Sequence, residues 1–555
     1  MKKLLCTLAF MVLSSSNLFA QYDIPGAAKF EYGEEIPDDS GKLVKIIGEA
    51  NNKIYTLVTK ENAITGSITY YIRVFGAEKM DLISTNKIVL PEFKDKDLDF
   101  EEIILLKDQL YVLGSTYHRK DKKHSLVATN VNEDGTLSNN VVTLFETSVQ
   151  NKTNKGAFYL KVDDNNENVL ISHISFFPKE DKLGYEMKLF DYALQQKFET
   201  TEHFGYDDDK KQYGLNIADF ELNKNNDLFL LIAEGYRDKN IKDRITNLEL
   251  HAYKASNNYK KEVITINTKG NNILNGSIIA VNNSEVKLAG LYSTIDKNGK
   301  IQRNIKGVFA ANVSLKDNAT SKVVFNDIDY ETKVKILGKR KADKEKELNS
   351  SYYVNGISYK ENGEITISYE FRQLHASASG VGPLSFKVIT IVNNEIILST
   401  INPDNTLKWM NVIPKIQMAS YKSIGLAMGS AGGSANVTVS IAASINLASF
   451  GKGPEYLGAI NFFDSKGDLN FIFNDNIKNK GITDIEKIKD VGNLNKSVPT
   501  IFTFDSNGNM TRKDPEEAIK NELILRPRVF KRNGDHILIY SSRKSQDKLG
   551  RLNIK

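Results

Sequence analysis

The stretch from Leu215 to Ile266 decides the fold, because it has the pattern of four short strands joined by polar turns. It contains, in order, LNIADFEL (residues 215–222), LFLLIA (228–233), LELHAY (248–253) and VITI (263–266), with turns at Asn225–Asp227 and Ser256–Asn258. Alternation of apolar and polar residues indicates a half-buried strand, and a short run that is apolar throughout indicates a strand buried on both faces. The stretch therefore predicts a four-stranded antiparallel meander.

The polar turn that precedes the apolar run occurs eight times along the chain. The strand after each turn opens at Ile54, Leu110, Val169, Leu228, Val286, Ile365, Leu469 and Ile537. Successive openings are 56, 59, 59, 58, 79, 104 and 68 residues apart. A recurring period of this size indicates a repeat architecture, in which each unit packs against its neighbours. The Asn, Asp and Gly residues of the turns supply the positive φ angles that tight turns need.

Eight four-stranded units in series predict an all-β fold, a β-propeller most simply built of eight blades, with seven as the alternative count. A solenoid usually has shorter repeats, and stacked sandwiches would need Greek-key crossovers. The last unit lacks a fourth strand, whereas residues 27–32 offer a spare alternating segment before the first full unit. We therefore expect this N-terminal strand to pair with the C-terminal strand and close the ring, which removes two open edges.

In architecture the chain resembles exported bacterial β-propellers, and the resemblance covers a single domain over residues 21–555. It extends to no characterised family. The sequence has no repeated Trp-Asp dipeptide, no repeated Gly-Gly pair and no repeated Ser-x-Asp-x-Gly-x-Thr box. The single tryptophan, Trp409, excludes a propeller with tryptophan docking in every blade. The resemblance implies a fold and transfers no chemistry.

Residues 1–20 are predicted to be a secretory signal peptide. Two lysines precede the apolar core Leu4–Leu13, and the small residue Ala20 stands at the expected cleavage site. Ten apolar residues are too few to span a bilayer. The only cysteine, Cys6, lies inside this core, so we expect a mature protein without a disulfide or a lipid anchor. The expected location is the periplasm, the outer-membrane surface or the exterior of the cell.

The charge balance argues against two classes of partner. The 555 residues include 74 basic and 69 acidic ones, which gives a net charge of +5. No block of Lys and Arg suggests a nucleic-acid surface, and no basic amphipathic helix suggests a membrane surface. We therefore expect no nucleic-acid partner and no transmembrane segment.

Two insertions interrupt the period, and both are links between blades. Residues 333–349 are strongly charged and predict a solvated helix or loop. Residues 418–453 are rich in Gly, Ala and Ser and predict a flexible loop with a weak extra hairpin, or a hairpin that inserts into a partner or a membrane. The loops between second and third strands, such as residues 234–244, 375–385 and 476–498, are also long. All of this elaboration falls on one face, which we expect to extend into solvent and to carry the function.

The second strands end in polar residues at comparable places, and these residues are predicted to ring the upper mouth of the channel. The candidates for ligand binding are His173, Glu234, Arg237, Glu370, Arg372, Asn474 and Asp475. Polar residues of this kind bind a polar ligand or peptide, or they satisfy one another as rim hydrogen bonds and salt bridges between blades. The sequence leaves both interpretations open.

Motifs of catalysis are missing from the sequence. It contains no His-Glu-x-x-His, no Gly-x-Ser-x-Gly, no phosphate-binding loop and no ligand spacing among its seven histidines, so we predict no catalytic residue, no metal and no cofactor. The predicted function is a non-catalytic binding or scaffold protein of the bacterial cell envelope or exterior, whose partner is an envelope or extracellular protein or a polar ligand. The alternative is a hydrolase or lyase acting on glycans or peptides, with Glu234 and Glu370 as a carboxylate pair.

Overall fold

The computed structural model describes most of the chain from Tyr22 onward. The described ranges are 22–24, 28–37, 41–62, 67–163, 165–177, 180, 182–205, 211–237, 244–282, 284–296, 300–320, 322–379, 386–423, 437–441, 453–494, 497–515, 523–534, 536–543 and 546–554. The predicted signal peptide lies outside the described residues.

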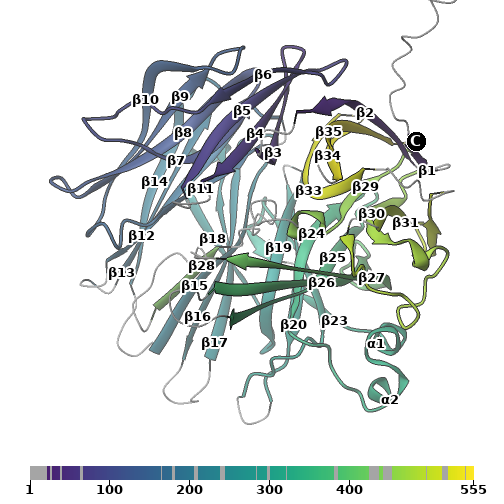
Figure 1. Cartoon of the computed structure of the whole chain (residues 1–555). Coiled ribbons are helices and arrows are strands. Elements are labelled where there is room, and N and C mark those ends of the chain that lie inside the picture. The colour runs from purple at the N-terminus through teal and green to yellow at the C-terminus, as the bar shows by residue number, and fades with distance from the viewer. Residues whose placement is uncertain are drawn as a thin grey trace, which may run out of the picture.

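Over these ranges eight four-stranded antiparallel blades form a ring, which confirms the predicted β-propeller (Figure 1). Blades are numbered here along the chain, and the first strand of each is the innermost. Blade one is β3 (Lys42–Ala50), β4 (Lys53–Glu61), β5 (Ile68–Gly76) and β6 (Leu82–Lys87). Blade two is β7 (Asp99–Leu106), β8 (Gln109–His118), β9 (Lys123–Val131) and β10 (Leu137–Ser148). Blade three is β11 (Ala157–Val162), β12 (Asn168–Phe177), β13 (Lys182–Asp191) and β14 (Gln196–Gly205). Blade four is β15 (Lys211–Leu222), β16 (Leu228–Arg237), β17 (Arg244–Tyr253) and β18 (Lys261–Ile266).

The second half of the ring follows the same plan. Blade five is β19 (Asn272–Asn282), β20 (Glu285–Ser293), β21 (Gly307–Ser314) and a split outer strand, β22 (Ala319–Thr320) and β23 (Val324–Asp327). Blade six is β24 (Tyr352–Tyr359), β25 (Ile365–Ser379), β26 (Phe386–Ile401) and β27 (Leu407–Ser423). Blade seven is β29 (Ile460–Phe463), β30 (Leu469–Asn476), β31 (Ser497–Phe504) and β32 (Met510–Lys513). Blade eight is β33 (Ile524–Asn533), β34 (His536–Arg543), β35 (Gln546–Ile554) and the N-terminal strand β2 (Ala28–Ile36), which also pairs with β1 (Tyr22–Ile24).

The turns between first and second strands have the predicted conformation. Residues with positive φ in these turns are Asn51, Asn52, Lys107, Asn166, Asn226, Gly363, Gly467 and Gly534. A left-handed residue reverses the chain within two or three positions, so the second strand pairs directly with the first. The repeated polar turns thus set the register of the two inner strands of a blade.

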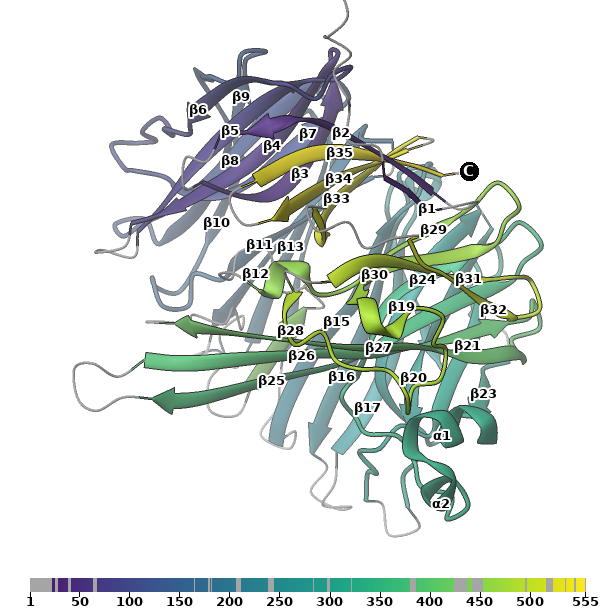
Figure 2. The same ribbon diagram turned by 45° about the vertical axis from the view of Figure 1, so that its right-hand side comes forward.

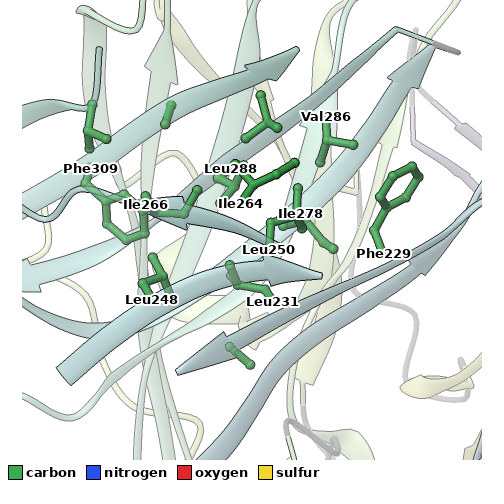
Figure 3. Close-up of a cluster of buried hydrophobic side chains, with 14 of the residues drawn as sticks. Phe229, Leu231, Leu248, Leu250, Ile264, Ile266, Ile278, Val286, Leu288 and Phe309 are labelled. Carbon is green, nitrogen blue, oxygen red and sulfur yellow. The ribbon is translucent and has the colours of Figure 1, made fainter. Parts of the chain in front are cut away.

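Apolar packing between neighbouring blades forms the core. Each of the eight interfaces around the ring contains one cluster of buried aliphatic and aromatic side chains. Figure 3 shows the cluster between blades four and five, where Phe229 and Leu231 of β16 face Val286 and Leu288 of β20 and Phe309 of β21. Burial of one such side chain contributes about 1.5–3 kcal/mol, so the ring is held by many equivalent contacts.

The predicted closure by an N-terminal strand is confirmed. In β2, residues from Ala28 to Ile36 pair antiparallel with β35, where they lie opposite Ile554 to Asp547. Figure 1 shows the purple strand β2 beside the yellow strand β35. The side chains of Ala28 and Phe30 join the apolar cluster between blades seven and eight, so the first and last segments of the chain complete one blade together.

Blade six departs from the prediction. Of the loop expected at residues 375–385, the described residues 375–379 belong to β25, and β26 begins at Phe386. The insertion expected from residue 418 also begins inside a strand, since β27 continues to Ser423. These three strands run together beyond the blade, as Figure 2 shows, and bulges separate the extension from the blade itself. The expected loop residues 375–379 are small or polar, and they pair as strand with residues 386–390 of β26.

The insertions also differ from the expectation in detail. Within residues 418–453, β28 (Val437–Ile441) does not extend from the top face but pairs parallel to β15, on the channel side of blade four. The charged insertion at 333–349 overlaps two short helices, α1 (Tyr330–Leu337) and α2 (Lys339–Ala342). Single 3-10 turns occur at η2 (Ala255–Asn257), η5 (Pro454–Tyr456) and η6 (Ile477–Asn479). None of the helices in the described ranges is long and apolar enough to cross a membrane.

Closure by β2 gives a first prediction. Replacing the buried Phe30 by Ala should lower the free energy of unfolding by about 3–5 kcal/mol, because the cavity lies where the ring closes. The matched control is Tyr353→Ala, which removes an aromatic ring that is 51% exposed. Urea unfolding of both variants measures the difference. An effect of Phe30→Ala no larger than that of the control would show that β2 does not hold the ring closed.

Candidate functional site in the central channel

The inner strands enclose a cavity of about 620 Å³ in the channel. Its wall comes from the innermost strands of six blades, β3, β7, β11, β24, β29 and β33, and from nearby turns. Apolar side chains such as Ile103 and Phe530 make up part of the wall. The polar and charged lining residues are Lys45, Glu102, Asn166, Asn355, Asn461, Arg528 and Lys531. A cavity of this size and mixed lining has the dimensions of a small-molecule site.

A buried charged cluster lies against this cavity. The carboxylate of Glu370 on β25 is fully buried and forms an ion pair of 2.9 Å with Lys415 on β27, which is also fully buried. Arg372 lies 2.8 Å from the same carboxylate, and Arg528 on β33 lies 3.5 Å from it. Arg372 also donates to the side-chain carbonyl of Asn355 on β24. Because Arg528 and Asn355 both line the cavity, the cluster connects the interior of blade six with the channel.

The three cations determine the protonation of Glu370. Burial alone would raise the pKa of the carboxyl group, but Lys415, Arg372 and Arg528 outweigh it and lower the pKa to about 2. Burial lowers the pKa of Lys415, and its ion pair with Glu370 opposes that shift. Glu370 is therefore an anion at every ordinary pH. Its ionic contacts hold strands from blades six and eight together.

Arg528 is fixed against the main chain of the link into blade seven. A Cβ atom on Gly458 would lie 2.7 Å from Nε of Arg528, and Gly458 has a φ of +101°. Only glycine fits here, for its backbone conformation and for the close approach of the guanidinium. Lys415 and Gln417 extend the network, since Gln417 accepts from Lys415 and from the Gly458 amide. The guanidinium thus has little freedom to move.

Three of the seven predicted site residues belong to this network. Glu370 and Arg372 form its centre, although Glu370 lies inside β25 and not at its end. Asn474 on β30 joins it through its main-chain carbonyl, which accepts from Gln417. The Asn474 side chain donates to the carbonyls of Tyr456 and Leu525, so it fixes the same link and the start of β33.

His173 lies in a different interface, between blades two and three. Its Nε2 and the Nδ1 of His124 lie 2.9 and 3.1 Å from the carbonyl oxygen of Lys155, which accepts from both rings. Burial lowers the pKa of His173 to about 4 and that of His124 to about 3. Both rings are therefore neutral near pH 7. The predicted rim histidine is here part of a buried contact between blades.

The remaining three candidates are not brought to the cluster. Asp475 is buried and pairs at 2.8 Å with Arg512 inside blade seven, and burial raises its pKa in spite of that partner. Glu234 accepts a hydrogen bond of 3.4 Å from Asn247 in blade four. Arg237 is the last residue of β16, and its side chain lies outside the described residues.

Sequence reasoning missed Lys415 and Arg528, because both lie within strands that are otherwise mainly apolar. A signal was nevertheless present. Each follows a proline, in Pro414-Lys415 and in Pro527-Arg528, and a proline inside a strand marks a bulge or an interrupted ladder. The structure has a register shift on β33 between Leu525 and Phe530, next to Arg528. Basic residues beside such prolines are candidates for buried polar clusters.

Comparisons with known proteins find only remote similarities between structures. No family model matches the chain, and no curated protein matches it. Among solved structures, it is similar to Sqt1 from Chaetomium thermophilum, with 10% identity, coverage of 94% of this chain and 99% of that chain, and a TM-score of 0.35. The polysaccharide lyase Uly1 gives 10% identity, the same coverage and a TM-score of 0.33. The β-propeller domain of the Trilobed protease from Pyrococcus furiosus gives 9% identity, 70% and 95% coverage, and a TM-score of 0.31. At these TM-scores the similarities carry no argument about function.

The charged cluster predicts that loss of its carboxylate destabilises the protein much more than loss of one of its cations. Glu370→Gln should lower the free energy of unfolding by about 3–5 kcal/mol, because it leaves three cations without their shared carboxylate. Lys415→Met should cost less, since Arg372 and Arg528 still face Glu370. Urea unfolding tests both variants. The control is Asp343→Asn, which removes an exposed ion pair with Lys339 and should leave stability unchanged. A greater loss with Lys415→Met would contradict this account.

The histidine contact predicts a loss of stability in mild acid. The folded pKa values of His124 and His173 lie below the ordinary value of 6.5, so the unfolded chain binds protons first as the pH falls. Their part of the free energy of unfolding should decline below pH 6.5 and continue to decline toward pH 4, by about 1.4 kcal/mol per pH unit for each ring.

Urea midpoints at pH 7, 6 and 5 check this expectation. His173→Asn should flatten the decline, whereas the control His375→Asn, at an exposed position, should leave it as in the unmodified protein. Parallel pH profiles for His173→Asn and the unmodified protein would show that this histidine is not the titrating group.

Proposed function

We propose that the protein is a non-catalytic binding or scaffold protein of the bacterial cell envelope or exterior, which holds a polar ligand or a polar segment of a partner in the channel. One observation carries this proposal. The cavity of about 620 Å³ has in its wall an arginine, Arg528, that belongs to a rigid charged cluster. A preformed cavity with a few fixed polar groups is the usual form of a binding site.

The state of Glu370 favours binding over catalysis. A general acid or base works best with a pKa near the working pH, whereas the pKa of Glu370 is about 2. The carboxylate is also fully buried and surrounded by three cations. Glu234 lies two blades away on β16, so the two carboxylates have unrelated surroundings. These facts support a structural role for Glu370. They do not favour the alternative, in which Glu234 and Glu370 act as the two catalytic carboxylates of a glycosidase.

The proposed site has a centre and a wider rim. Its centre is the cavity with Arg528, Arg372 and Glu370, and Asn474 supports it from blade seven. Glu234 and Arg237 remain proposed members of the rim, whereas His173 and Asp475 are buried within the ring of blades. Export to the envelope or exterior rests on the signal-peptide pattern of residues 1–20.

A cavity-filling variant tests the proposal. Ala459 lines the cavity, and Ala459→Phe should abolish or strongly weaken capture of the ligand or partner from envelope extracts, identified by mass spectrometry. Ser256→Phe, which adds the same ring at an exposed turn, is the control and should capture as the unmodified protein does. Thermal midpoints of both variants confirm that they are folded.

Two results would overturn the proposal. Capture that is unaffected by Ala459→Phe would place the binding surface outside the channel. Turnover of glycans or peptides by the unmodified protein, lost in Glu234→Ala, would favour the hydrolase or lyase alternative.

A further inference from the structure

Arg528 has donors that the protein does not use. A guanidinium carries five N–H groups and needs acceptors for them when it is buried. Its contact with Glu370 is 3.5 Å, at the limit of a hydrogen bond, because Arg372 occupies the same carboxylate oxygen at 2.8 Å. Within the described part of the chain, the Nε of Arg528 has no hydrogen-bond partner, but it is buried against Gly458, so the donors left for a ligand are those of the terminal nitrogens. The side chain is 19% exposed and lines the cavity.

The charges around Arg528 do not cancel. Glu370 is one carboxylate facing Lys415, Arg372 and Arg528, so the cluster has more positive than negative charge. Lys531 of the same strand also lines the cavity. On the inner strands of blades one and two, Lys45 and Glu102 form a neutral pair at 3.0 Å. The wall formed by β33 is therefore the positive side of the cavity, and a partly buried positive charge attracts an anion with little screening.

The position of Arg528 is fixed before any ligand arrives. Gly458 lies against Nε, and the main chain around Gly458 is itself held by Gln417. An arginine that need not be ordered on binding loses less entropy when it forms hydrogen bonds. Its unused donors and its preformed position are the two features of a specific anion site.

We propose that the cavity binds a small ligand that carries a carboxylate, with the carboxylate on the guanidinium of Arg528. The planar guanidinium matches a carboxylate through two parallel hydrogen bonds. The apolar side chains of Ile103, Pro527 and Phe530 in the wall suit a neutral or apolar body, so one charged end and an uncharged remainder fit the lining. This inference rests on the proposed function, that the channel is a binding site, and names the chemical class of its ligand.

Calorimetric titration with matched acids and amides tests the inference. The probes are benzoate, succinate, citrate and the disaccharide of galacturonic acid, each beside its neutral amide, with inorganic phosphate and sulfate as separate arms. At least one carboxylate should bind ten or more times tighter than its amide. Such a preference corresponds to about 1.4 kcal/mol or more.

Substitutions of Arg528 test whether this side chain is responsible for the preference for carboxylates. Arg528→Gln should weaken binding of that carboxylate by at least about tenfold, since the charge-assisted pair is lost. Arg528→Lys keeps the charge without the planar fork and should bind with intermediate affinity. The control is Arg340→Gln, which removes the same charge from an exposed position of α2 outside the cavity lining and should leave affinity unchanged. Should Arg528→Gln fail to fold, Arg528→Lys alone decides the test.

Each other outcome counts against the inference in a distinct way. Amides that bind as tightly as their acids, with binding blocked by Ala459→Phe, would overturn the carboxylate assignment and leave the proposed function standing. Tighter binding of phosphate or sulfate than of every carboxylate would overturn it in favour of a tetrahedral anion. Failure of every probe to bind would overturn the carboxylate assignment as well. The proposed function is tested separately, by whether Ala459→Phe abolishes capture of the ligand or partner.

Discussion

The packing of each blade between its two neighbours is the interaction on which the rest of the structure depends. Every blade has a second strand that is largely buried on both faces, and eight interfacial clusters bury its apolar side chains around the ring. An open, linear array of blades would leave the outer faces of its first and last blades exposed to water. Strand β2 prevents this by completing blade eight, so the ring closes and its innermost strands enclose a channel. The cavity follows from this closure, because side chains of six inner strands are brought together around one axis.

The charged cluster occurs where this regular packing is interrupted. Strands β25 and β26 carry bulges next to Glu370 and Asn394, beyond which the extension of blade six begins. Strand β33 is irregular next to Arg528. A bulge turns polar groups inward and leaves them without ladder partners, so these groups need other charges or carbonyls. Buried ion pairs add little to stability compared with apolar residues, because desolvation offsets their attraction. The binding proposed for the cavity would account for charged groups at this position.

Much of the architecture could be predicted from the sequence because it repeats. Residues such as Asn52 and Asn226 mark turns through their tolerance of positive φ, and the run at 228–233 marks a doubly buried strand. The end of β25 could not be predicted, since the alternation of Ala and Ser at residues 376–379 carries too little hydrophobic contrast to distinguish a strand from a loop. The parallel pairing of β28 with β15 is a contact between residues more than 200 positions apart, which local pattern cannot specify.

The candidate site was predictable only in part for the same reason. Glu370 and Arg372 stand out as charged residues that follow an apolar strand, and the structure brings them together. Arg528 reaches Glu370 across 158 positions and from two blades away. No local sequence pattern predicts this contact, since it depends on the irregularity of β33 and on the close approach permitted by Gly458.

The most direct test of the account is the side-chain NMR signal of Arg528, assigned through its loss in Arg528→Gln. The central claim is that the guanidinium of Arg528, which lines the cavity, is the group that holds the ligand in the channel. Titration of arginine-labelled protein with the tightest carboxylate should shift this signal with the affinity measured by calorimetry, while the signal of the exposed Arg340 stays in place. An Arg528 signal that does not move while the ligand saturates the protein would contradict the account.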